Sequence, residues 1–279
     1  MKERIVERAL LLVAFSAVAA VFLIAIFIFS EGVPLVAKIG VFKFIASTQW
    51  APSRGQFGIL PMIIGSLEVT LLAIIVGAVL GLSCAMFLAE FAPPWSVRIL
   101  KPLIELLAGI PSVVYGFIGV VVLVPWIRTT FGGPGFSVLA SGLILGVMVL
   151  PTIVAISLDA LRAVPLSYKE GSLALGATRW QTMYRTILPA ARSGIVAAMI
   201  LGMGRAVGET MAVIMVAGNA IEIPHSLLDP VRTLTSNIAL EMGYAAGDHQ
   251  AALFATGMIL FIITMILNTI ALLTIRTER

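Results

Sequence analysis

Six long apolar segments alternate with polar ones along the chain. They cover approximately residues 9–30, 61–89, 103–127, 138–158, 194–217 and 250–275. A helix needs about 20 residues to cross the ~30 Å hydrocarbon core of a bilayer, and each segment is long enough. An open strand in lipid would leave backbone groups unpaired, so the pattern predicts helices. We therefore expect an all-α, polytopic membrane protein with six transmembrane helices, forming a single transmembrane domain over residues 1–279.

The first apolar run resembles the start of a secretory signal. Lys2, Arg4 and Arg8 precede an apolar stretch from Ala9 to Phe29. That stretch is longer than the core of a signal peptide, and no convincing cleavage site follows it. We expect an uncleaved first span.

The composition agrees with a membrane protein. Hydrophobic residues make up 60% of the chain and charged residues 11%, with a mean hydropathy of +1.09. A soluble protein of this length covers its outside largely with polar groups, which this chain does not have in sufficient number. Cys84 is the only cysteine, which excludes an intrachain disulfide.

The net charge of +4 is explained by where the basic residues fall, and not by nucleic-acid binding. Of the 18 Lys and Arg residues, 12 lie at the two termini and in the loops 90–102 and 159–193, and 5 lie in the other loops. Arg205 lies inside a span. Because basic residues concentrate in cytoplasmic loops, both termini and the 159–193 loop are predicted to be cytoplasmic.

The 159–193 loop is the longest strongly charged connection. Pro165 offers a helix start, Tyr168 to Ala174 can form a short helix, and Gly176 would end that helix in a left-handed conformation. Thr178 to Ile187 form a second helical stretch with apolar residues at helical spacing. An amphipathic pair along the membrane surface would give another protein a place to bind. Composition alone favours a loop that simply joins two spans.

The spacing within this loop resembles the EAA loop of binding-protein-dependent ABC importers. That motif is Glu, two small residues, three residues, Gly, nine residues and Ile-x-Leu-Pro. The matching positions are Glu170, Gly171, Ser172, Gly176, Leu188 and Pro189. The departures are Gly171 and Ser172 in place of two alanines, and Thr186 in place of isoleucine. In that family the short helix docks in a cleft of the ATPase subunit, so the resemblance implies that Glu170 to Gly176 are the coupling element.

The fifth apolar segment contains two charges. Arg205 and Glu209 are four residues apart, which on a continuous helix places them on one face, one turn from each other. A charge at the bilayer centre costs about 2.5–3.5 kcal/mol on insertion scales. The pair is either a salt bridge that fixes helix packing or part of an anion path. In the second interpretation, which we favour, Arg205 attracts the anion, Glu209 tunes or releases it, and Thr210 adds a hydroxyl.

Other polar residues have simpler explanations. Glu90 lies near an end of the second apolar segment, where its side chain can reach the interface. Lys101 and Glu105 are spaced as a local i,i+4 pair. His225 and His249 are far apart with no cysteine nearby. We expect no metal, no cofactor and no catalytic residue.

Several longer segments resemble the PstC-type permease of the bacterial phosphate ABC importer. They are residues 49–66, 101–116, 159–165, 171–180, 204–219 and 230–238. The resemblance implies a type I ABC importer permease fold, a place in the bacterial inner membrane and half of a translocation pathway for inorganic phosphate. The partners it implies are a sister permease subunit, two copies of a cytoplasmic ATPase and an extracytoplasmic phosphate-binding protein. It also associates Arg205 and Glu209, in the GRAxGET segment, with phosphate passage.

The chain has no GxxxxGK[ST] loop, so nucleotide must be bound and hydrolysed by a partner.

Three alternatives to a phosphate permease follow from the same residues. A permease for molybdate or sulfate remains an alternative within the same class. An ion-coupled secondary transporter would use Glu209 as its coupling carboxylate, but it would not need the amphipathic 159–193 loop. A membrane-embedded enzyme ranks last, because the sequence contains no HExxH, GxSxG or intramembrane carboxylate cluster.

Overall fold

The computed structural model describes residues 2–276 and contains two compact units. Unit 1 comprises Met1–Leu60 and Asn237–Ile262, and unit 2 comprises Pro61–Ser236 and Ile263–Arg279. Met1 and residues 277–279, which belong to the two ends expected in the cytoplasm, lie outside the described residues.

Unit 1 is built from long helices and a short hairpin. Its elements are α1 (Lys2–Ile39), α2 (Val41–Ala46), β1 (Trp50–Ala51), a 3-10 turn (Pro52–Arg54), β2 (Gln56–Phe57) and the first part of α14 (Asp248–Arg276). The two strands are antiparallel, with Trp50 opposite Phe57. Helices α1 and α14 approach closely at Gly32, where an added Cβ would lie 2.9 Å from the backbone of Ala255. A small residue at such a contact lets two membrane helices pack backbone to backbone.

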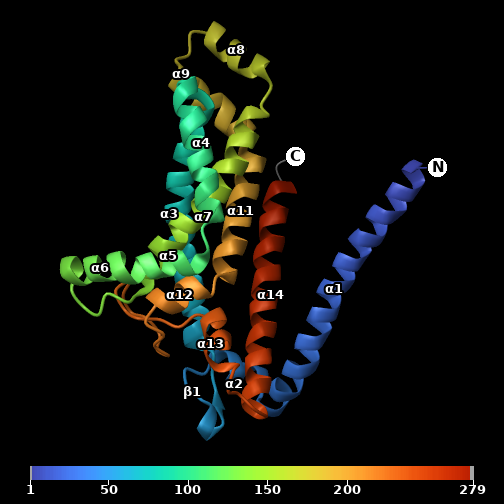
Figure 1. Cartoon of the computed structure of the whole chain (residues 1–279), viewed down its shortest axis with the longest axis vertical. Helices are drawn as coiled ribbons and strands as arrows, with labels where there is room; N and C mark the ends of the chain where they lie inside the picture. Colours follow the sequence, from blue (N-terminus) through green and yellow to red (C-terminus); the bar gives the residue numbers. More distant parts are fainter. Residues whose placement is uncertain (1, 277–279) are drawn as a thin grey trace. The chain divides into compact units, whose positions relative to one another are not determined.

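Unit 2 contains most of the remaining helices. They are α3 (Leu60–Met86), α4 (Pro94–Gly109), α5 (Ser112–Ile118), α6 (Val124–Phe131), α7 (Val138–Arg162), α8 (Leu166–Ala174), α9 (Arg179–Thr182), α10 (Leu188–Ala190), α11 (Arg192–Gly208) and α12 (Met211–Val216). Three π-helical turns, Phe87–Phe91, Gly119–Leu123 and Met183–Ile187, continue neighbouring helices. Helix α13 (Leu234–Glu241) begins in unit 2 and ends in unit 1. Within unit 2, α8 lies at one end and α12 toward the other (Figure 1).

Helix α7 forms the centre of unit 2 because it packs against both α3 and α11. An added Cβ at Gly77 of α3 would lie 2.7 Å from Val149 of α7. An added Cβ at Gly202 of α11 would lie 3.0 Å from Ile153 of the same helix. Val149 and Ile153 are fully buried. Glycines on the outer two helices therefore allow all three to pack tightly around the apolar side chains of α7.

Two of the six predicted spans are not continuous helices. In the predicted 103–127 segment, α4 ends at Gly109 and α5 begins at Ser112. Between them Ile110 is extended, with φ −69° and ψ 128°. The ring of Pro111 disfavours the helical conformation for the residue before it, which favours a break at this place. In the predicted 194–217 segment, α11 ends at Gly208 and α12 begins at Met211.

Long apolar helices nevertheless account for most of the predicted spans. Five described helical segments are long and apolar enough to cross a membrane: Val6–Ile39, Leu60–Phe91, Ser112–Phe131, Val138–Arg162 and Asp248–Ile270. A sixth is obtained if Arg179–Ala190 and Arg192–Gly208, which meet at 72°, are counted as one broken span. The all-α class of the prediction is confirmed.

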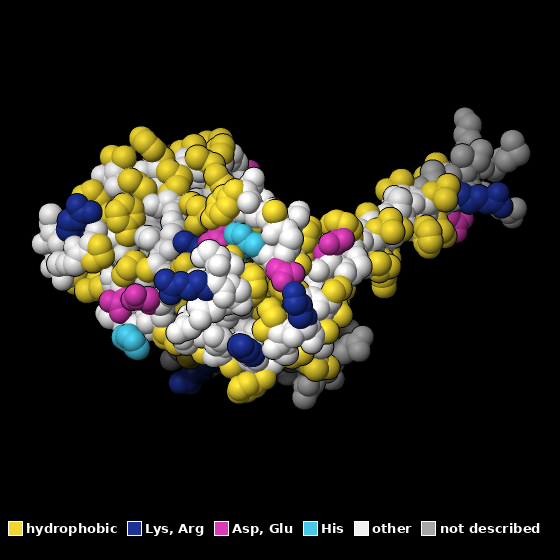
Figure 2. Space-filling model, turned by 90° about the horizontal axis from the view of Figure 1, so that it is seen from below, with side chains coloured by type: hydrophobic (Ala, Val, Ile, Leu, Met, Phe, Trp, Pro, Cys, Tyr) yellow, Lys and Arg dark blue, Asp and Glu magenta, His cyan; other side chains and the backbone are white. Residues whose placement is uncertain are grey.

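The surface is suited to lipid. Large apolar side chains on α1 are exposed, including Leu10, Leu11 and Leu12, at 65–68%. Figure 2 shows one end of the molecule, where hydrophobic side chains lie among uncharged groups and charged side chains occur in small groups. Contact with hydrocarbon removes the cost that such a surface would have in water.

Candidate functional site

The break between α11 and α12 is held by hydrogen bonds from several directions. Glu209 is extended, with φ −69° and ψ 133°. Its Oε1 accepts a hydrogen bond from the backbone nitrogen of Ala212 at 3.1 Å, and its carbonyl oxygen accepts one from Thr235 Oγ1 at 2.9 Å. Thr210 Oγ1 donates to the carbonyl oxygen of Gly208 at 3.3 Å. Non-helical backbone inside a membrane protein needs this kind of internal pairing.

The predicted helical pair of Arg205 and Glu209 is wrong in its geometry. Arg205 lies in the last turn of α11, whereas Glu209 lies beyond the helix end. Among the described residues, no ion pair within 4.0 Å joins the two side chains. The i,i+4 argument required an unbroken helix, and the helix ends between them. The carboxylate instead caps the first turn of α12.

Arg205 is partly buried in the last turn of α11. Its neighbour Ala206 belongs to a buried cluster that also includes Tyr115 of α5, whose hydroxyl donates to the carbonyl oxygen of Leu107 at 2.7 Å. No hydrogen bond or ion pair joins the side chain of Arg205 to any other described residue. A cation in the last turn of a helix is favoured by the helix dipole. Within the described part of the chain, no carboxylate therefore neutralises the charge of Arg205.

The two helix breaks belong to one apolar cluster. Ile110, at the break between α4 and α5, packs against a buried cluster that includes Tyr115 of α5, Ala206 of α11 and Ala212 of α12. Gly116 of α5 is close to α12, since an added Cβ there would lie 3.1 Å from the Cα of Ala212. Both interruptions of the helical backbone therefore pack against one buried cluster, to which Ala206, the neighbour of Arg205, also belongs.

Helix α8 is the second candidate element, and the sequence predicted it well. It begins at Leu166, directly after Pro165, and ends at Ala174. Gly176 follows with φ +83°, the left-handed conformation predicted for it. Thr178 then starts the next helix with a capping box, in which its side chain and that of Gln181 each pair with the other's backbone.

Most of α8 is solvent-exposed. Of its nine residues, only Lys169 and Ser172 are partly buried. Lys169 Nζ pairs with Glu90 Oε2 at 2.7 Å, and Ser172 Oγ lies 2.9 Å from Thr182 Oγ1. Glu170 and Gly171 are exposed. Large apolar side chains are exposed around them: Leu166, Tyr168, Leu173, Leu175 and Trp180.

The second helical stretch of the 159–193 loop packs against the other helices of unit 2. Met183 and Ile187 are buried among residues of α7 and α11, whereas Tyr184 is exposed. Leu188 is partly buried and Pro189 is exposed at α10. The predicted amphipathic character of Thr178 to Ile187 is present in part, because Met183 and Ile187 face the protein whereas Trp180 and Tyr184 are exposed.

A polar cluster in unit 1 was missed from the sequence. Trp50 Nε1 donates to Glu241 Oε2 at 2.9 Å, and His249 Nε2 lies 2.8 Å from the same oxygen. Trp50 and Glu241 are both buried. These residues lie in three separate parts of the chain, and no spacing rule connects them. His249 is therefore part of a hydrogen-bonded cluster, and the described residues contain no group suited to hold a metal.

A comparison with protein families decides the class. Residues 77–276 match the model of the binding-protein-dependent transport system inner membrane component. The chain belongs to this family. That assignment confirms the resemblance to binding-protein-dependent ABC importers seen in the 159–193 loop.

Individual members of the permease family are similar over most of the chain. A probable ABC transporter permease protein, YqgH, from Bacillus subtilis is 44% identical over 89% of this chain and 83% of that protein. The phosphate transport system permease protein PstC of Xylella fastidiosa is 38% identical over 85% of this chain and 80% of its own length. The probable phosphate transport system permease protein PstC of Methanocaldococcus jannaschii is 32% identical over 88% and 85%.

Solved structures of ABC importers have the same permease fold. A chain of the inward-facing MetNI methionine ABC transporter aligns with a TM-score of 0.65 and 20% identity, covering 83% of this chain and 100% of that one. A chain of a bacterial ABC transporter that imports the acidic polysaccharide alginate aligns with a TM-score of 0.65 and 16% identity, covering 97% and 96%. The predicted type I ABC importer permease fold is confirmed.

Proposed function

We propose that this chain forms half of the translocation pathway of a phosphate ABC importer. The similarity to PstC proteins, which extends over most of the chain, is the observation that carries the proposal. The second half of the pathway would come from a sister permease subunit of the same fold. Two copies of a cytoplasmic ATPase and an extracytoplasmic phosphate-binding protein complete the importer, which lies in the inner membrane with both termini of this chain in the cytoplasm.

In this proposal Arg205 is the residue that contacts the anion. Its guanidinium offers several N–H donors in a plane, which matches the oxygens of phosphate better than a lysine would. Its charge is unpaired within the described part of the chain and lies at the end of α11, beside a helix break. An intramembrane charge without a carboxylate partner is costly unless it serves a ligand or a watery path.

Glu209 and Thr210 have a supporting place in the pathway. Their side chains fix the extended turn between α11 and α12 through Ala212 N and the Gly208 carbonyl. That turn ends α11 three residues after Arg205. We propose that this arrangement, and not a direct Arg205–Glu209 ion pair, holds the guanidinium toward the pathway.

Helix α8 is the element that would contact the ATPase. Glu170 and Gly171 are exposed, and apolar side chains such as Leu175, at 91% exposure, extend from the same loop. A small helix with exposed apolar residues is suited to a cleft in a partner protein. ATP binding and hydrolysis would then move α8, and the pathway would alternate between its two sides while the ATPase performs the chemistry.

The test is transport by the assembled system. Cells that carry this chain together with its partner genes are supplied with radiolabelled phosphate, molybdate or sulfate, with and without an intact ATPase subunit. We expect ATP-dependent uptake that is selective for phosphate. Uptake of molybdate or sulfate instead of phosphate would show that the substrate of the importer is another oxyanion. Uptake that persists without the ATPase and follows the proton gradient would exclude the importer mechanism.

A further inference from the structure

Helix α8 is joined to the rest of unit 2 by very few side chains. Lys169 and Ser172 are its only partly buried residues, and they are three positions apart, on one face of the helix. Glu170 and Gly171, which lie between them, are exposed. Force applied to α8 from outside therefore reaches the membrane-spanning helices through these two side chains and through the chain that follows α8, whose Met183 and Ile187 belong to one buried cluster with Ala85 and Leu88.

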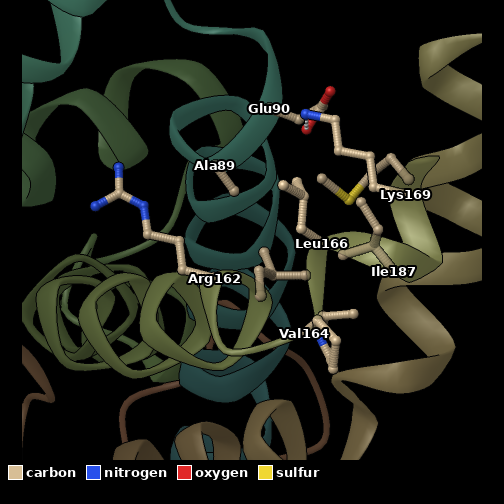
Figure 3. A pocket seen from close by; sticks show the side chains of 10 residues that line it. Ala89, Glu90, Arg162, Val164, Leu166, Lys169 and Ile187 are labelled. Carbon is tan, nitrogen blue, oxygen red and sulfur yellow. Dashed lines mark hydrogen bonds and ion pairs between the residues drawn. The ribbon is translucent and has the colours of Figure 1, made fainter.

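The contact made by Lys169 is a charged one at a largely buried site. Lys169 Nζ lies 2.7 Å from Glu90 Oε2, and the side chain of Glu90 is only 6% exposed, compared with 35% for Lys169. The two residues line a cavity of about 140 Å³ together with Leu166 of α8 and Ile187. Figure 3 shows the ammonium group beside the carboxylate, while the guanidinium of Arg162 points to the opposite side. Lys169 is therefore the cation that neutralises this buried carboxylate within the described part of the chain.

The contact made by Ser172 is a hydrogen bond between neutral groups and is weaker than the Lys169–Glu90 ion pair. Its hydroxyl is 2.9 Å from Thr182 Oγ1, and Thr186 Oγ1 donates to it at 3.4 Å. Hydrogen bonds between neutral hydroxyls are roughly half as strong as those between charged groups. Separating a buried carboxylate from its cation is costly, so the Lys169–Glu90 contact resists displacement more than the Ser172 contact does.

Glu90 lies on a helix whose displacement can be transmitted to neighbouring helices. It belongs to the π-helical turn Phe87–Phe91, which continues α3 without interruption. Helix α3 packs on α7 at Gly77, and α7 packs on α11, the helix that carries Arg205. π-helical turns often occur at functional sites, where a helix departs from its regular hydrogen bonding. A continuous set of packed helices thus connects Glu90 with the helix break.

We propose that the Lys169–Glu90 ion pair is the link that transmits displacement of α8 to α3, and so couples the ATPase to the transport pathway. The proposal rests on the proposed function as an ABC importer subunit. Lys169 and Glu90 are positioning residues, since neither is placed at the pathway itself. Without the pair, displacement of α8 reaches α3 less effectively, so less phosphate is transported for each ATP hydrolysed.

The experiment measures phosphate uptake and ATP hydrolysis together. The complete importer, with its sister permease and ATPase subunits, is reconstituted in proteoliposomes with the phosphate-binding protein. Glu90→Gln and Lys169→Met each remove one charge with little change of shape, and the double variant Glu90→Lys/Lys169→Glu restores a pair with reversed sign. Glu105→Gln is the matched control, because Glu105 forms only an exposed pair with Lys101 at 4.0 Å.

We expect both single variants to assemble and hydrolyse ATP, with phosphate transported per ATP lowered by about fivefold or more, the lower range of typical coupling effects. The reversed pair should recover part of this ratio, and Glu105→Gln should keep the wild-type ratio. An unchanged ratio in both single variants, or uptake and hydrolysis that fall together with the amount of assembled complex, would overturn the proposal. If the wild-type importer itself shows no ATP-dependent phosphate uptake, the proposed function fails, and the link fails with it.

Discussion

The side chain of Glu209 caps the helix that follows it, with Oε1 accepting a hydrogen bond from the backbone nitrogen of Ala212 at 3.1 Å. This contact explains how a charged residue is kept within an apolar segment without an ion pair to Arg205. The first N–H groups of any helix lack intrahelical acceptors, and the carboxylate satisfies one of them in α12. The residue therefore contributes to the shape of the break.

Replacing Glu209 separates its capping role from its charge. Glu209→Gln retains an oxygen that can accept from Ala212, so we expect its thermal unfolding in detergent to match that of the wild type. Glu209→Ala removes the acceptor and should lower stability by about 1 kcal/mol, the usual cost of losing a helix cap. Equal destabilisation by both variants would show that the charge, and not the cap, matters for the fold.

The Trp50–Glu241 hydrogen bond should stabilise the hairpin of unit 1. Trp50→Phe keeps an aromatic ring against Phe57 but loses the Nε1–H donor to a buried carboxylate. We expect a loss of about 1–3 kcal/mol, measured as a lower midpoint of thermal unfolding. Trp95→Phe is the control, because Trp95 is 67% exposed, and it should leave the midpoint unchanged. Similar midpoints for Trp50→Phe and the wild type would contradict this role of the indole.

Two glycines of the 159–193 loop should respond in opposite directions to the same change. Gly176 has φ +83°, so Gly176→Ala strains the turn after α8 and should cost about 1–2 kcal/mol. Gly171 is helical and has no atom within 4 Å of an added Cβ, so Gly171→Ala should stabilise α8 by about 0.5–1 kcal/mol. The measurement is phosphate uptake by the assembled importer on warming. Greater heat sensitivity of Gly171→Ala than of Gly176→Ala would be the contrary result.

The proposed orientation can be tested by labelling single cysteines. Cys84 is the only native cysteine, and after its replacement by alanine a new one is introduced as Leu175→Cys or Ser53→Cys; both positions are exposed. The cells are first stripped of their outer membrane while the inner membrane stays sealed. A membrane-impermeant maleimide should then label Ser53→Cys only. Leu175→Cys should react once the membrane is opened. The reverse pattern would place the termini outside the cytoplasm.

Hydropathy predicted the apolar segments and local sequence predicted α8, because both depend on neighbouring residues. Pro165 and Gly176 bracket α8 in the structure as their backbone preferences require. The break at Glu209 was not predicted, since hydropathy does not detect a turn whose polar groups are paired inside the protein. The sequence did contain a signal for the break before Ser112, namely Pro111. The burial of Glu90 depends on Lys169, 79 positions away, and no local pattern reveals such a contact.

The central claim, that Arg205 serves the anion pathway, is tested most directly by the initial rate of radiolabelled phosphate uptake with Arg205→Gln. The variant should assemble normally and take up phosphate at less than about a tenth of the wild-type rate, because the charge that contacts the anion is lost. Arg205→Lys should retain a fraction of the rate. Arg98→Gln, at an exposed position of α4, should transport as the wild type does. Normal uptake by a fully assembled Arg205→Gln importer would contradict the account and leave Arg205 with a structural role only.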